Sequence, residues 1–210
     1  MTSVPGLLDH LVYATPDLEE TLKWFEATSG VRPLPGGIHP AWRTQNAILP
    51  LSSSTYLEIV GPDHSAHGDP PTIFHLDSLS GPRLVTWAAK GRDLHTLAAR
   101  ARLRGIELGG PTSGSRQRLD GSRLTWNLTD PLQSRSDGVL PFFIDWGSSP
   151  HPAAMALPEI TLTDLHAEHP DPLPLRAHLT VLGLDLRVEH GPFPRLLSSL
   201  MTPRGVLTLT

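Results

Sequence analysis

The stretch that decides the fold runs from Leu7 to Glu58 and opens with the apolar run LLDHLVYA, which starts at Leu7. This run carries one polar pair, Asp9 and His10, and the later run YLEIV, which starts at Tyr56, carries one acid, Glu58. Short runs rich in Leu, Val, Ile and Tyr predict β-strands. If both strands belong to one sheet, His10 and Glu58 come close together on its concave face.

A helix is predicted between these two strands. Thr15-Pro16-Asp17 is typical of a helix start, with Thr15 as the N-cap and Pro16 at the first helical position. Leu18, Leu22 and Phe25 recur at helical spacing, and Gly30 is typical of a helix end. Strand-like runs over 44–51 and 55–60 follow. The unit therefore has the order strand, helix, then two or three strands.

The same unit recurs along the chain. The predicted helix starts Asp17 and Asp93 lie 76 residues apart (93 − 17), and the helix ends Gly30 and Gly105 lie 75 apart (105 − 30). Equal separations indicate an internal repeat of one supersecondary unit. The second copy continues with a polar loop over 109–122 and with strands over 123–128 and 140–146. A third copy is indicated by Asp171, at about twice the first spacing.

The sequence therefore predicts an α+β protein made of tandem βαβββ modules. We expect a first module over 1–61, a connector over 62–82, a second module over 83–150 and a third, partial βαβββ unit over 151–210. A sheet with one apolar face cannot stand alone, so the units must pair. Because the third unit lacks a fourth partner, we predict a homodimer.

Composition narrows the class of protein. Of the 210 residues, 39% are hydrophobic and 18% charged, which is ordinary for a globular protein, and the net charge of −4 argues against nucleic-acid binding. Cys is absent, which excludes disulfides and thiolate metal sites. No signal peptide and no apolar stretch of about 18 residues is found, so we expect a cytoplasmic protein without a membrane partner. His64 and His67 in the connector fit either a zinc site or, more simply, a solvated linker.

The motifs, taken in order, resemble the glyoxalase-like domain family of the vicinal oxygen chelate superfamily. The residues that carry this resemblance are Leu8 to Ala14 with Pro16-Asp17-Leu18, Gly36-Gly37-Ile38-His39-Pro40, Thr44-Gln45-Asn46, Tyr56-Leu57-Glu58 and Leu140 to Trp146. The resemblance covers residues 7–147 well and the third unit more loosely. It implies that two modules curl into a cup that binds a small molecule around a divalent ion.

The resemblance also implies a ligand set. His10 and Glu58 match the metal-ligand positions of the first module, and His39 would complete a set of two His and one carboxylate if its loop folds over the cup. Trp87 stands where the second module should carry its first ligand, and Trp cannot bind a metal. Asp145 is near the last-strand position. Glu58 and His39 are also the candidates for moving a proton.

Other residues are candidates for substrate contact. Alongside Trp87 and Asp145 these are Trp42, Thr44 and Asn46. Each has a plainer reading: the tryptophans pack in the core, and the polar residues satisfy backbone groups on an edge strand. His10 itself can be a hydrogen-bonded core residue.

Three functions stay open at this point. The first is a metal-dependent lyase, isomerase or dioxygenase, in which a bound ion polarises an oxygen-rich substrate. The second is a metal-free binding protein that sequesters a small ligand, which the missing ligands of the second module favour. The third is a structural protein with a filled cup. The substrate and the ion cannot be named from the sequence.

Overall fold

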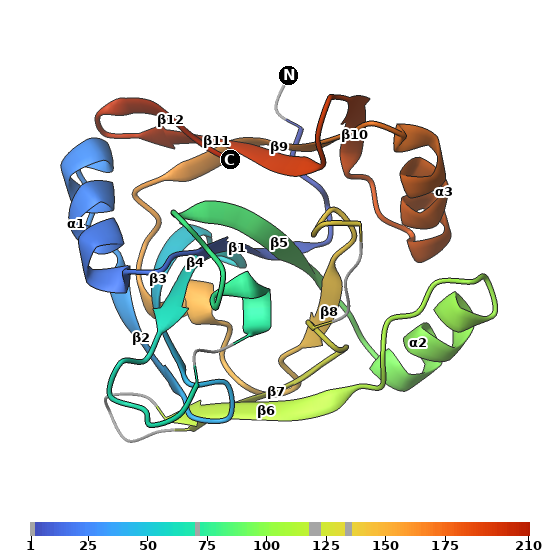
Figure 1. Ribbon diagram of the computed structural model, residues 1–210, viewed down its shortest axis with the longest axis horizontal. Coiled ribbons are helices and arrows are strands. Elements are labelled where there is room, and N and C mark those ends of the chain that lie inside the picture. The colour runs from blue at the N-terminus through green and yellow to red at the C-terminus, as the bar shows by residue number, and fades with distance from the viewer. Residues whose placement is uncertain (1–2, 70–71, 118–122, 133–135) are drawn as a thin grey trace.

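The computed structural model describes residues 3–69, 72–117, 123–132 and 136–210 (Figure 1). Within these residues the chain forms one curved sheet of eight strands, a second sheet of four strands and three α-helices. The helices lie on the outside of the curved sheet, and the four-stranded sheet lies across one side of it (Figure 1). The predicted α+β class with a curved mixed sheet is confirmed. No helix in the described ranges is long and apolar enough to cross a membrane.

The first module has the predicted order of elements. Its elements are β1 (Leu8–Ala14), α1 (Leu18–Ser29), β2 (Leu34–His39), β3 (Thr44–Ser52) and β4 (Thr55–Pro62). The strands lie in the order β2-β3-β4-β1, so the first and last strands of the module are neighbours and run parallel. This pairing brings the residues of LLDHLVYA beside those of YLEIV.

The first helix begins two residues later than its start signals suggest. Asp17 is the N-cap, and its side chain accepts a hydrogen bond from the Glu20 N–H at 3.0 Å. Thr15 instead accepts from the Asp17 N–H at 3.2 Å. At the other end Gly30 adopts φ 82° and donates to Glu26, as expected of a glycine C-cap.

The second module repeats the first and joins it in the same sheet. It contains β5 (Arg83–Lys90), α2 (Leu94–Arg102), β6 (Thr112–Gln117), β7 (Arg123–Leu128) and β8 (Phe142–Asp145), and the 3₁₀ turn η1 (Ile73–His75) precedes it. The sheet continues as β1-β5-β8-β7-β6, with β1 and β5 antiparallel at the centre. The segment expected to be a polar loop thus contains an edge strand, β6, while residues 118–122 lie outside the described residues.

The third unit has the same element order but a different strand order. It contains β9 (Thr161–His169), α3 (Pro172–Leu182), β10 (Arg187–His190), β11 (Arg195–Thr202) and β12 (Gly205–Leu209), preceded by the 3₁₀ turn η2 (Pro152–Met155). Its strands lie in the order β10-β9-β11-β12, with the first strand inside the sheet. It is therefore not a third copy of the module in its strand order. The homodimer expected from this unit stays a prediction.

Two apolar layers flank the curved sheet. Its convex face packs with the second sheet in one large core that includes Trp87, Leu165 and Leu200, all fully buried. Its concave face carries a smaller cluster around Ala88 and Phe142. Because side chains alternate between the faces of a strand, each residue belongs to one layer or the other. The concave layer is where the polar residues of the first module gather.

Candidate functional site

A small cavity of ≈ 40 Å³ lies on the concave face, between the two modules. Both modules line it with aromatic and aliphatic side chains, and the first module adds most of the polar ones. Its lining includes His10, His39, Trp42, Thr44, Asn46, Tyr56, Glu58, Phe74, Arg116, Trp126, Phe142, Ile144 and Trp146. We call this space the inner cavity. A volume of this size holds about one water molecule or a ligand group of a few atoms.

His10 is held by its neighbour in β1. Its Nδ1 lies 2.8 Å from Asp9 Oδ1, and both side chains are buried. An ionised carboxylate only accepts hydrogen bonds, so Nδ1 carries the proton and donates it to Asp9. In the neutral ring, Nε2 then bears the lone pair. Nε2 is the atom that faces Glu58, across 3.7 Å from Glu58 Oε2.

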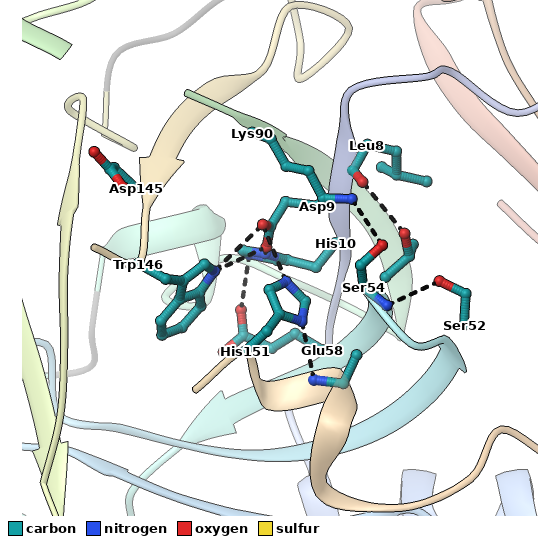
Figure 2. A network of polar contacts seen from close by, with 12 residues as sticks. Leu8, Asp9, His10, Ser52, Ser54, Glu58, Lys90, Asp145, Trp146 and His151 are labelled. Carbon is teal, nitrogen blue, oxygen red and sulfur yellow. Dashed lines mark hydrogen bonds and ion pairs between the residues drawn. The ribbon is translucent and has the colours of Figure 1, made fainter. Parts of the chain in front are cut away.

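Asp9 accepts hydrogen bonds from two further residues (Figure 2). His151, at the start of η2, lies 3.1 Å from Asp9 Oδ2 through Nε2, and the Trp146 indole N–H is 3.3 Å from both carboxylate oxygens. His151 Nδ1 accepts from the Ala153 N–H at 3.2 Å, so Nε2 is the donor to Asp9.

The two histidines keep Asp9 ionised. Burial by itself raises the pKa of Asp9, but the hydrogen bonds and charges of His10 and His151 outweigh burial. The pKa falls from 3.8 to about 2. Asp9 is therefore a fixed negative charge that orients the ring of His10.

A second chain of polar contacts holds Glu58. Glu58 Oε1 accepts a short hydrogen bond from the Asn46 side-chain amide. Asn46 Oδ1 in turn accepts from Arg116 at 3.2 Å, across from the second module. All three side chains are buried. Asn46 therefore connects a buried acid to a buried cation, and Glu58 Oε2 stays directed at His10.

His39 lies in the aromatic part of the cavity wall. Its Nδ1 is 3.2 Å from Thr44 Oγ1, and its ring lies near the indoles of Trp42 and Trp126, with centroids 5.8 and 6.2 Å away. Burial lowers the pKa of His39, and the charge of Arg116 lowers it further, against the opposite effect of Glu58. His39 is therefore disposed to be neutral at pH 7.

Aromatic rings complete the cavity wall. Tyr56 stacks on the His10 ring at 4.6 Å, and burial together with the charges of Glu58 and Asp9 raises the pKa of Tyr56 well above 10. The ring centroids of Trp126 and Trp146 are 5.4 Å apart. The wall is thus apolar and rigid around a few polar atoms, which is typical of ligand sites.

Trp87 does not lie at this cavity. In the pairing of β1 with β5, Leu11 lies beside Trp87 and His10 lies beside Ala88. Trp87 therefore points to the convex face, where it is fully buried and donates to the Val139 carbonyl at 2.9 Å. The expected equivalence of Trp87 with His10 was wrong by one residue, and one residue changes the face of a strand.

Asp145 also lies away from the cavity. Phe142 and Ile144 point into it, so Asp145, next along β8, points out. Its carboxylate accepts from the Gly147 N–H at 2.9 Å, and Figure 2 shows it apart from the Asp9 cluster. Asp145 therefore does not line the inner cavity. The other predicted residues, including His10, His39, Glu58, Trp42, Thr44 and Asn46, all line the inner cavity.

The donor set does not fit the divalent ion that the resemblance implied. No group of three or more His, Asp or Glu that could hold a metal occurs among the described residues. The second module presents Ala88, Phe142 and Ile144 at the concave face, none of which is a ligand. Arg116 places a positive charge at the same cavity. At the inner cavity, His10 Nε2 and Glu58 Oε2 face each other as two possible metal ligands.

Two polar residues of the site were not foreseen. Arg116 lay in a segment without apolar alternation, because β6 is a polar edge strand. His151 lies 142 residues from Asp9, in the connector before the third unit, and no spacing in the sequence relates the two. The polar pair Asp9 and His10, which interrupts an apolar strand, was the one local signal for this network.

Comparison with known proteins agrees with the fold. The family model of the glyoxalase-like domain matches residues 8–183. No curated protein matches the chain. A solved structure of a hypothetical protein from Staphylococcus aureus is similar with a TM-score of 0.71 and 12% identity, over 97% of this chain and 98% of that one. At this identity the likeness shows a shared fold.

Two structures of methylmalonyl-CoA epimerase also match, less closely. The protein from Mycobacterium tuberculosis has a TM-score of 0.44 and 20% identity, over 70% of this chain and 92% of that one. The protein from Streptomyces coelicolor, solved with 2-nitronate-propionyl-CoA, has a TM-score of 0.47 and 20% identity, over 72% and 100%. The resemblance that the sequence motifs indicated is confirmed by the match to the family model.

Proposed function

Because the chain belongs to the glyoxalase-like domain family, we propose that it is a binding protein for a small organic molecule, whose polar group it holds in the inner cavity without a protein-bound metal ion. The cavity suits a group of a few atoms, such as a hydroxyl next to a carbonyl. The observation that carries the proposal is the pair of acceptors formed by His10 Nε2 and Glu58 Oε2.

When the His10 ring is neutral, these two atoms are both acceptors and need a donor between them. With His10 Nδ1 donating to Asp9, the lone pair of Nε2 faces a carboxylate oxygen 3.7 Å away. Two buried acceptors that face each other are unfavourable unless a hydrogen-bond donor satisfies both. A ligand hydroxyl or N–H placed beside them supplies that donor. Polar ligands with a hydroxyl or amine are therefore favoured over plain hydrocarbons.

The contacts that the possible metal ligands already make support a site without a metal ion. Glu58 already accepts from Asn46, and His39 already contacts Thr44. A cation would also sit close to the charge of Arg116, which raises the cost of bringing it there. These contacts favour the metal-free alternative over metal-dependent lyase, isomerase or dioxygenase chemistry.

A second candidate function is proton transfer on the bound molecule. A histidine backed by a carboxylate, with its free nitrogen at a cavity, is the arrangement of a general base. In this reading His10 Nε2 accepts a proton from an O–H or an acidic C–H of the ligand, and Asp9 stabilises the imidazolium. Glu58 is the second group able to accept a proton there. Both functions use the same orientation of His10.

The decisive experiment measures metal content and ligand binding on the same untagged protein. Elemental analysis is expected to find much less than one ion per chain. Tryptophan fluorescence, titrated with a panel of small hydroxy acids, is expected to find ligands whose binding is weakened by His10→Gln and Glu58→Gln but not by the exposed His95→Gln. One ion per chain, lost in His10→Gln but kept in His95→Gln, would overturn the proposal. Deuterium exchange into a bound ligand in D₂O separates proton transfer from binding alone.

A further inference from the structure

A much larger hollow adjoins the inner cavity. It has a volume of ≈ 1200 Å³ and lies between the two end strands of the curved sheet, β2 and β6. Residues 37–42 form one side and residues 112–116 the other, with Arg123 and Trp126 of β7. We call it the outer groove.

The inner cavity and the outer groove share part of their walls. His39, Trp42, Arg116 and Trp126 line both. Trp126 packs directly on the backbone of Gly114, where a Cβ would collide with the indole. These side chains therefore form a wall that both spaces share, with a guanidinium at Arg116 and aromatic rings at the other three residues. A molecule that lies in the groove against these side chains is next to the inner cavity.

The inner cavity and the outer groove can hold parts of a ligand of very different size. The inner cavity, at ≈ 40 Å³, takes a group of a few atoms, whereas ligand sites commonly measure about 300–1,000 Å³. The outer groove, at ≈ 1200 Å³, is large enough for the rest of such a ligand. An elongated molecule fits the pair of spaces better than a compact one.

The charges of the groove select the ligand further. Its described lining contains the exposed Arg123 and no Asp or Glu, although the whole chain has a net charge of −4. Arg123 is exposed and donates to Ser115 Oγ at 2.7 Å, so its guanidinium is held at the groove. A local excess of positive charge attracts anions.

We infer that the outer groove binds the body of an elongated organic anion. Its aromatic or apolar part lies against Trp42 and Trp126, and its carboxylate, sulfonate or phosphate group lies at Arg123. This inference rests on the proposed function, because the opposite end of the same molecule is the polar group in the inner cavity. The substrate class is thus an amphipathic acid, longer than the inner cavity can hold.

The test compares two fluorescent probes that differ in charge. 1-Anilinonaphthalene-8-sulfonate is an aromatic anion, and N-phenyl-1-naphthylamine has the same rings without the sulfonate. We expect the anion to bind one per chain, with energy transfer from tryptophan. Arg123→Gln should weaken the anion about fivefold or more and the neutral probe less than about twofold, since a charged contact is lost. Arg100→Gln, an exposed arginine on α2, is the matched control and should leave both unchanged.

Equal binding of the two probes, equal effects of Arg123→Gln and Arg100→Gln, or no saturable binding would each overturn the inference. The proposed function is checked separately with His10→Gln. This variant should weaken binding of the small hydroxy acids. If those acids bind but the anionic probe does not, the groove inference fails and the proposed function stands. If the anionic probe binds and the acids do not, the inner cavity is not a ligand site. Because the groove inference is built on that site, the inference and the proposed function then both fail.

Discussion

Replacing Asp9 by Asn tests the network on which the proposed site depends. Asp9 is buried, and His10, His151 and Trp146 all donate to its carboxylate. An amide carries no charge and turns one of its two acceptor atoms into a donor. Asp9→Asn should therefore leave at least one buried N–H without a good acceptor. The expected loss at pH 7 is about 2–4 kcal/mol of unfolding free energy.

The pKa of Asp9 sets how this loss depends on pH. In the folded protein the pKa is about 2, against 3.8 for the ordinary group. A depressed pKa contributes stability above the unfolded pKa that disappears as pH falls through the folded pKa. The difference between the folded and the unfolded pKa corresponds to about 2 kcal/mol of unfolding free energy. About 1 kcal/mol of this contribution is already lost at pH 3.

Urea denaturation of wild type and Asp9→Asn at pH 6, 4 and 3 measures this dependence. The gap between the two unfolding free energies should narrow by about 1 kcal/mol from pH 6 to pH 3, because only the wild type has this carboxylate to protonate. Asp77→Asn, at an exposed position, is the matched control and should show no such narrowing. A gap that stays constant from pH 6 to pH 3 would refute the account of Asp9 as a buried, ionised acceptor.

Three further predictions concern residues around the site. His151→Ala should lower the unfolding free energy by about 1–2 kcal/mol. His151→Gln should recover more than half of this loss, because an amide can still donate to Asp9. Equal losses for the two variants in urea denaturation would contradict this role of His151. Gly36→Ala should cost about 1–3 kcal/mol, because its Cβ would collide with the Asn46 and Arg116 side chains, whereas Gly110→Ala, with open space around it, should be near neutral by the same measurement. The His39 ring should titrate below its ordinary pKa of 6.5 in NMR, so its neutral form adds stability that is lost as pH falls below that value; a midpoint above 6.5 would show that it is not buried as described.

Much of the site could be predicted because it lies on two neighbouring strands. His10 and Glu58 each interrupt an apolar run, and β1 and β4 pair in parallel with Val12 beside Glu58, so the two polar side chains share a face. Asn46 lies on β3, directly beside β4. Local patterns were sufficient here, because the strands that carry these residues belong to one module and are adjacent in the sheet.

Register limited the prediction for the second module. The prediction placed Trp87 at the position of His10, but Trp87 pairs with Leu11 and shares its face of the sheet. The repeat spacing fixes the order of elements to within a residue or two, whereas the face of a strand depends on a single residue. The error with Asp145 has the same cause.

The sequence by itself determined the α+β class, the two βαβββ modules and the polar residues of the first module, because these follow from periodicity and from helix signals over a few residues. Only the tertiary structure decided that the second module faces the cavity with aliphatic groups, that Arg116 reaches Asn46 across 70 residues and that His151 reaches Asp9 across 142. The physical reason is that such contacts arise from how the sheet curves and where the connector returns. No local pattern of residues records those two features.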